Sequence, residues 1–211
     1  MMGWLAPLFA LAVPLLALPG CATSPPSAFY TLTPIDEVDT RSAALDDRGL
    51  RVGLGPLTLP HFLDRPQIVS RDGVQLRFDE FHRWGGSLDD DFLRVWGENL
   101  AYLLGTSRVF VYPSDSKADL DFLVLAHLLR FEGGSDGAVW LKVRWVVRDP
   151  YRDDTLVVRE QTYRRQLGEE AIDEAALVRG LSLVLGDFSR DVADVLSQLP
   201  KPRPPAPSPI D

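Results

Sequence analysis

Residues 120–167 read LDFLVLAHLLRFEGGSDGAVWLKVRWVVRDPYRDDTLVVREQTYRRQL, and this stretch decides the fold. The glycine-rich segment Gly133–Gly137 separates an apolar run, Leu120–Phe131, from a second run, Val139–Val147, that is rich in valine and tryptophan. Aspartates and a proline follow at 149–154, and a third β-type run comes after them. Gly, Asp and Pro between such runs are typical of hairpin connections, so the stretch predicts a three-stranded antiparallel meander.

A helix is predicted upstream of the meander. Ser87 is the expected N-cap, aspartates at 89–91 suit the positive end of the helix dipole, and Gly105 is a natural stop. Apolar side chains recur with the period of one helix face at Leu88, Phe92, Val95, Trp96, Leu100 and Leu103. The segment is therefore expected to be amphipathic, with one face in the core.

A second amphipathic helix is predicted downstream, from about Asp173 to Leu199. Its apolar face consists of Leu177, Leu181, Val184, Leu185, Phe188, Val192 and Leu196. Gly180 and Gly186 each weaken a helix by roughly 1 kcal/mol relative to alanine. We expect them to permit close packing of this helix on the sheet.

The region before the first helix is predicted to be mostly β. Arg71–Gly73 is a hairpin signal, whereas the proline-framed segment Pro60–Pro66 is expected to be irregular. Short strands are expected at 29–32, 50–54, 67–70 and 74–78. The order of strands, helix, three strands and helix predicts a single α+β domain, with a mostly antiparallel sheet and both amphipathic helices packed on one face.

Composition excludes several classes of protein. The 211 residues are 45% hydrophobic and 25% charged, which is the usage of a globular chain rather than a disordered one. With 22 basic and 30 acidic side chains the net charge is −8, so no nucleic-acid partner is expected. The one cysteine, Cys21, excludes an intramolecular disulfide and multi-cysteine metal sites.

The N-terminus predicts export and lipidation. Residues 1–20 carry no charged side chain and are apolar up to Leu18, which is typical of a signal peptide. The string Leu18-Pro19-Gly20-Cys21 resembles a bacterial lipobox, in which the cysteine becomes the lipidated first residue. The alternative is a buried free cysteine after an uncleaved helix. Ala22, in place of the aspartate that favours inner-membrane retention, indicates the outer membrane, with the domain on its periplasmic face.

Processing at this point divides the chain into four parts. Residues 1–20 would be removed, and residues 21–28, rich in proline and serine, would form a lipidated tether. The folded domain is expected at 29–199. Residues 200–211 form a proline-rich tail that cannot continue the helix; it is interpreted as disordered, with a short docking segment as the alternative.

Catalytic and metal-binding patterns are scarce. Ser135 lies in a Gly-x-Ser-x-Gly string, but that nucleophile motif needs a strand before it and a helix after it, and here β-type runs flank it. The string is therefore predicted to be a turn. His61, His82 and His127 have no metal-ligand spacing, and structural or surface roles are expected for them. The sequence predicts no enzyme, no cofactor and no metal site.

Basic residues gather on the meander and its turns. They are Arg130, Lys142, Arg144, Arg148, Arg159, Arg164 and Arg165. A solvated outer sheet face explains them best. The alternative is a contact surface for acidic partners or lipid headgroups, which exposure of Trp140 or Trp145 beside them would favour.

Three segments together resemble a known family. They are Phe29-Tyr30-Thr31-Leu32, the string Leu57-Thr58-Leu59-Pro60-His61-Phe62-Leu63-Asp64-Arg65-Pro66-Gln67-Ile68-Val69, and His82-Arg83-Trp84 followed by Leu88 and the helix with Glu98-Asn99-Leu100. The chain is similar, over residues 21–200, to the PqiC/YmbA family of ABC-type transport auxiliary lipoproteins.

The resemblance implies a non-enzymatic outer-membrane lipoprotein. Such proteins work with inner-membrane MCE-domain proteins and their transporters, in lipid transport between membranes and in envelope integrity. Direct phospholipid contact and a homo-oligomer are compatible with that role. The resemblance implies that Leu63, Asp64, Arg65, Pro66 and Trp84 are partner-facing or fold-defining. The alternatives are an LptE-like chaperone of a β-barrel and a lipid-anchored esterase using Ser135.

Overall fold

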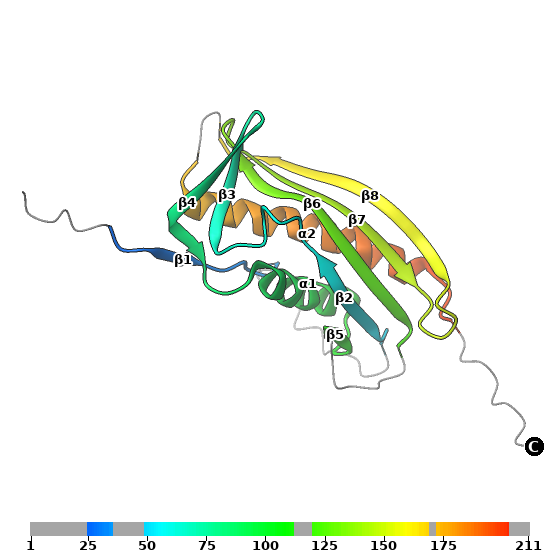
Figure 1. The fold of residues 1–211 in the computed structure, drawn as a ribbon. Helices are drawn as coiled ribbons and strands as arrows, with labels where there is room; N and C mark the ends of the chain where they lie inside the picture. The colour runs from blue at the N-terminus through cyan, green and yellow to red at the C-terminus, as the bar shows by residue number, and fades with distance from the viewer. Residues whose placement is uncertain (1–24, 36–48, 112–119, 169–171, 203–211) are drawn as a thin grey trace, which may run out of the picture.

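The structure, a computed structural model, describes residues 25–35, 49–111, 120–168 and 172–202. The predicted signal peptide, Cys21 and most of the proline-rich tail lie outside the described residues. Neither helix in the described part of the chain combines the length and hydropathy needed to cross a bilayer. The first and last described segments leave the molecule at opposite ends of its long axis (Figure 1).

Eight strands and two helices make up the described chain (Figure 1). They are β1 (Ala28–Tyr30), β2 (Val52–Thr58), β3 (Gln67–Asp72), β4 (Gln75–Trp84), α1 (Leu88–Leu104), β5 (Val109–Val111), β6 (Phe122–Gly134), β7 (Ala138–Arg148), β8 (Thr155–Gln166) and α2 (Glu174–Gln198). Both predicted helices are confirmed. Ser87 precedes α1, Gly105 ends it in the left-handed region with φ 62°, and Asp173 caps α2 by accepting from the N–H of Ala176 at 2.6 Å.

All eight strands form one sheet around β6. One edge of β6 pairs with β7, and β7 pairs with β8; both pairings are antiparallel, so the predicted meander is confirmed. The other edge of β6 pairs in parallel with β2 along its first half and with β3 at its end. The order from β1 to β5 is β1-β4-β3-β6-β2-β5.

The prediction of a mostly antiparallel sheet is wrong, because the sheet is mixed. The pairs β1·β4, β2·β5, β2·β6 and β3·β6 are all parallel, and only β3·β4 is antiparallel outside the meander. Parallel neighbours need a crossover connection, and the connection between the parallel neighbours β2 and β5 contains β3, β4 and α1. Alternation within a strand shows which face it buries, but it does not show which distant strand lies beside it.

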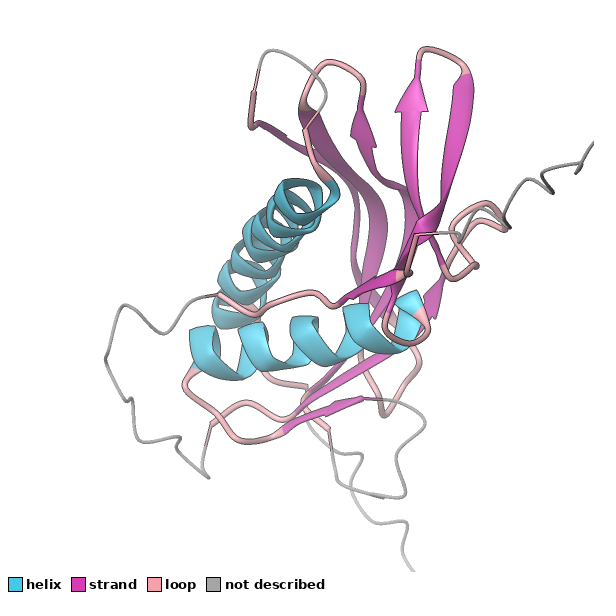
Figure 2. Ribbon diagram, turned by 90° about the vertical axis from the view of Figure 1, so that its left-hand side faces the viewer, coloured by secondary structure: helices cyan, strands magenta, loops and turns pink. Residues whose placement is uncertain are grey.

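The core lies where the helices meet the sheet. The ring of Phe188 on α2 lies 5.0 Å from Trp96 on α1 and 6.2 Å from Trp145 on β7, and all three side chains are fully buried. Figure 2 shows α2 running beside the strands, with α1 crossing below it. A Cβ added to Gly180 would lie 3.0 Å from both methyl carbons of Val139, so Gly180 does permit close packing on β7.

Candidate functional site

The segment after the predicted tether is held by side chains of both helices. The backbone N–H of Leu32 donates to Asp91 Oδ2 at 2.7 Å, and that of Thr33 donates to Ser182 Oγ at 3.1 Å. The Leu32 side chain itself is 1% exposed. Asp91 therefore anchors the N-terminal segment in addition to lying in the first turn of α1.

The proline-framed segment divides the predicted partner-facing residues into two groups. Leu63 and Trp84 are core residues, 1% and 4% exposed. Asp64 and Pro66 are exposed, and half-buried Arg65 places its guanidinium 3.9 Å from the centre of the Phe78 ring. The backbone carbonyl of Pro66 accepts from the N–H of Trp84 at 2.8 Å, so the segment is tied to β4. A partner role for these five residues stays a prediction.

A cavity of about 340 Å³ lies between the β3–β4 hairpin, the β6–β7 turn and the start of α2. Its walls are formed by Ile68, Ser70, Arg71, Asp72, Arg77, Phe78, Asp79, Gly134, Ser135, Ile172, Glu174 and Leu177. The guanidinium of Arg71 binds Glu132, which is fully buried and also accepts from Arg130 Nε at 2.9 Å. The cavity is therefore lined by both apolar and charged side chains, and one of the latter is a paired arginine.

Ser135 lies in the turn that joins β6 to β7. The N–H of Gly137 donates to the carbonyl of Gly134 at 3.2 Å, and a strand, not a helix, follows. The predicted turn is confirmed. The Ser135 hydroxyl donates to Asp72 Oδ1 at 2.9 Å, which links the β6–β7 turn to the tip of the β3–β4 hairpin.

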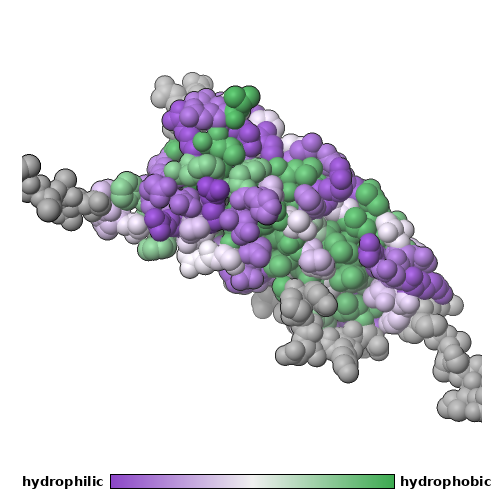
Figure 3. Space-filling model, viewed as in Figure 1, coloured by the Kyte–Doolittle hydropathy of each residue, from purple (hydrophilic) through white to green (hydrophobic). Residues whose placement is uncertain are grey.

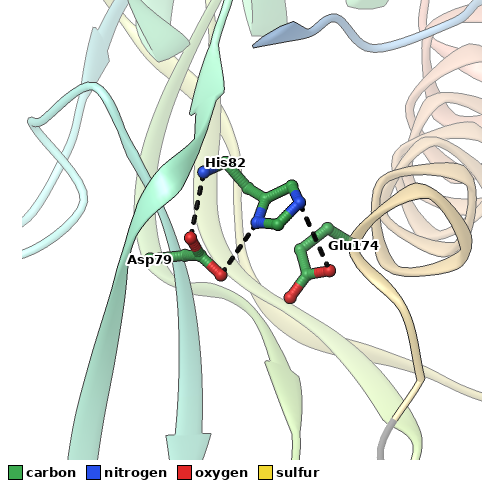
Figure 4. A group of neighbouring side chains, drawn as sticks. All are labelled: Asp79, His82 and Glu174. Carbon is green, nitrogen blue, oxygen red and sulfur yellow. Dashed lines mark hydrogen bonds and ion pairs between the residues drawn. The ribbon is translucent and has the colours of Figure 1, made fainter. Parts of the chain in front are cut away.

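A cluster of ionisable groups adjoins the cavity. His82 Nδ1 lies 3.0 Å from Asp79 Oδ2, and His82 Nε2 lies 3.9 Å from Glu174 Oε2 (Figure 4). All three residues are half-buried. Sequence reasoning missed this cluster, because only the short spacing of Asp79 and His82 was visible, and Glu174 is distant in the sequence.

Local hydrogen bonds fix the Asp79 carboxylate. Its Oδ1 accepts from the backbone N–H groups of Phe81 at 2.8 Å and His82 at 2.9 Å. Burial opposes ionisation of Asp79, but these donors and the neighbouring imidazole outweigh it and lower the pKa of Asp79 below its ordinary value. The cluster therefore contains an oriented carboxylate whose second oxygen faces His82.

The outer face of the meander is divided into apolar and charged parts. Register places Val146 of β7 between Leu125 of β6 and Val158 of β8, and these three residues are called the apolar row. Val158 is 61% exposed and the other two are half-buried. Figure 3 shows hydrophobic residues gathered over the strands on this face, with hydrophilic residues beside them.

The basic side chains of this face are mostly paired with acids. Lys142 and Arg144 both contact Glu160, at 3.0 and 2.7 Å. Half-buried Trp140 lies between the guanidinium groups of Arg130 and Arg164, 4.7 and 4.9 Å from its ring centre, whereas Trp145 is buried. These pairs neutralise much of the positive charge that the sequence showed on the meander.

Residues 30–193 match the model of a family described as the ABC-type transport auxiliary lipoprotein component. The chain belongs to this family. The resemblance found in the sequence is thereby confirmed, and the auxiliary lipoprotein match includes the proline-framed segment, the cavity and the ionisable cluster. The match ends before the proline-rich tail.

Solved structures share the fold of this auxiliary lipoprotein. Protein XCC0632 from Xanthomonas campestris matches with a TM-score of 0.65 and 14% identity, over 81% of this chain and 94% of that one. A second crystal structure, of an uncharacterised protein, matches with a TM-score of 0.61 and 17% identity, over 82% of this chain and 99% of that one. No curated protein matches the chain.

Proposed function

We propose that the protein is a non-enzymatic auxiliary component of an MCE/ABC-type system that moves lipids between the two bacterial membranes and supports envelope integrity. It would be anchored in the outer membrane through Cys21, with its domain in the periplasm. The family match over residues 30–193 carries this proposal, because that family is a transport auxiliary component. The lipobox-like string before the domain supports the anchor.

Two substitutions test the anchor. Cys21→Ser should release the protein into the soluble fraction of the periplasm, because the acyl chains that give stable membrane binding are lost. Ala22→Asp should keep it membrane-bound but move it to inner-membrane fractions. Unchanged outer-membrane association of Cys21→Ser would contradict lipid anchoring.

Co-purification tests the partner. The detergent-solubilised full chain should capture an MCE-domain protein together with its permease and ATPase. Capture of a β-barrel in their place would support the LptE-like alternative. We place the partner contact on the apolar row, because exposed Val158 lies in line with two half-buried apolar side chains on a face whose charges are mostly paired.

Charge placed in the apolar row tests that contact. Val158→Glu should reduce capture of the MCE-domain partner, because it puts a carboxylate among apolar contacts. Val74→Glu is the matched control, since Val74 is 99% exposed at the tip of the β3–β4 hairpin, outside the row. Equal capture by both variants would show that the contact lies elsewhere. Substitutions in the proline-framed segment would then be the next test.

A further inference from the structure

We propose that Asp79, His82 and Glu174 bind a divalent first-row transition metal ion, most favourably zinc. Each residue offers one ligand atom, and these atoms lie within 4.8 Å of one another. Asp79 and His82 belong to β4, whereas Glu174 is the first residue of α2 (Figure 4). A bound ion would therefore fasten the β3–β4 hairpin to the start of α2.

The spacing of the ligand atoms suits one ion after a small movement. Zinc–ligand distances of about 2.0–2.2 Å place neighbouring ligand atoms about 3–4 Å apart. The separation of 3.0 Å between His82 Nδ1 and Asp79 Oδ2 already lies in that range. Glu174 Oε2 lies 3.9 Å from the other ring nitrogen, Nε2, and an imidazole gives one nitrogen to an ion. To join Nδ1 and Asp79, the Glu174 carboxylate has to turn toward that side of the ring, and its side chain is 35% exposed.

The imidazole of His82 faces a carboxylate with each of its ring nitrogens. Its Nδ1 atom is shielded from solvent and lies 3.0 Å from Asp79 Oδ2. Two backbone N–H groups hold the other Asp79 oxygen, so Oδ2 stays directed at the ring. A metal ion between Nδ1 and Oδ2 would replace this contact and use the lone pair of the nitrogen.

The chemistry of the ligands and the adjoining cavity select the ion. One imidazole nitrogen with two carboxylate oxygens suits zinc and its neighbours, whereas magnesium and calcium prefer oxygen ligands alone. Asp79 and Glu174 also line the cavity of about 340 Å³, which has room for water as the remaining ligand.

Zinc titration of the EDTA-treated full chain in detergent tests the proposal. Calorimetry with ZnCl₂ should show one ion bound per chain, and zinc should raise the melting temperature. His82→Gln and Glu174→Gln should each weaken zinc binding by at least about tenfold. His127→Gln, which changes an exposed histidine on β6, should bind as the unchanged chain does.

Three outcomes would overturn the proposal. They are no zinc binding by the unchanged chain at millimolar concentration, equal binding by His82→Gln and Glu174→Gln, and an equal response to MgCl₂. Circular dichroism of the apo variants confirms that each is folded, and Glu174→Gln keeps the side-chain shape at a half-buried position. A cobalt(II) absorption spectrum that disappears in His82→Gln would show nitrogen ligation directly.

Discussion

The side-chain oxygen of Asn99 accepts a hydrogen bond of 2.7 Å from the backbone N–H of Ile35. Asn99 is 1% exposed, and its amide nitrogen donates to Ser189 Oγ at 3.1 Å. One side chain of α1 therefore joins the N-terminal segment to α2, and its oxygen and its amide nitrogen both have partners.

Asn99→Ala should lower the free energy of unfolding by about 1–3 kcal/mol, because it leaves the Ile35 N–H without its acceptor. Urea unfolding followed by circular dichroism measures the loss. Ser197→Ala is the control, since the Ser197 hydroxyl donates to the carbonyl of Ala193 within its own helix at 2.8 Å. If the two variants lost equal stability, the link through Asn99 would contribute no more to stability than a hydrogen bond within one helix.

Two helical glycines should respond to alanine in opposite directions. A Cβ at Gly180 would meet Val139 at 3.0 Å and Leu167 at 2.3 Å, whereas a Cβ at Gly97 would meet Leu54 and Val111 at an ordinary 3.7 Å. We expect Gly180→Ala to destabilise by about 1–3 kcal/mol and Gly97→Ala to stabilise by up to about 1 kcal/mol. Thermal unfolding of both variants checks the signs; a more stable Gly180→Ala would mean that α2 can shift away from β7.

Two carboxylates that each contact two cations should contribute unequally to the free energy of unfolding. Glu132 is fully buried between Arg71 and Arg130, whereas Glu160 contacts Lys142 and Arg144 at the surface. Glu132→Gln should cost about 1.5–3 kcal/mol, because buried charge-assisted hydrogen bonds are lost. Glu160→Gln should cost less, since water and salt screen that pair. Chemical unfolding at low and high salt compares them, and equal losses would contradict the role of burial.

Acid should destabilise the fold partly through Asp121. Burial raises the pKa of Asp121, but the backbone N–H and guanidinium of Arg51 and the charge of Lys201 outweigh it, so that its pKa is lowered in the folded chain. A lowered folded pKa stabilises the fold above the unfolded pKa of about 3.9, and this stabilisation is lost as pH falls through the folded value. The Asp121→Asn variant should therefore be less stable than the unchanged protein at pH 7, and it should lose less stability than that protein below about pH 4. Melting temperatures from pH 3 to 7 test this; parallel curves for the two proteins would refute it.

Local signals in the sequence were sufficient for the helices, the meander and the β3–β4 hairpin. Ser87 and Gly105 bracket α1 as predicted, but the Ser87 hydroxyl bonds Asp90 Oδ2 and makes no capping bond to the backbone. The parallel pairing of β2 with β6 could not be predicted, since it depends on packing between segments far apart in the sequence. For the same reason the sequence did not show that Glu174 lies beside Asp79 and His82. It also did not distinguish Leu63, which is buried, from Asp64, which is exposed.

The described chain enters at one end of the long axis and leaves at the other (Figure 1). Tension between a membrane anchor at the first end and a contact at the second would pass through the whole domain. At the entry, the load would fall on the three paired residues of β1 and on the bonds from Asp91 and Asn99 to the segment behind it. Tension on the tether would therefore enter the sheet through β4 and, one turn of chain later, enter α1 through Asp91 and Asn99.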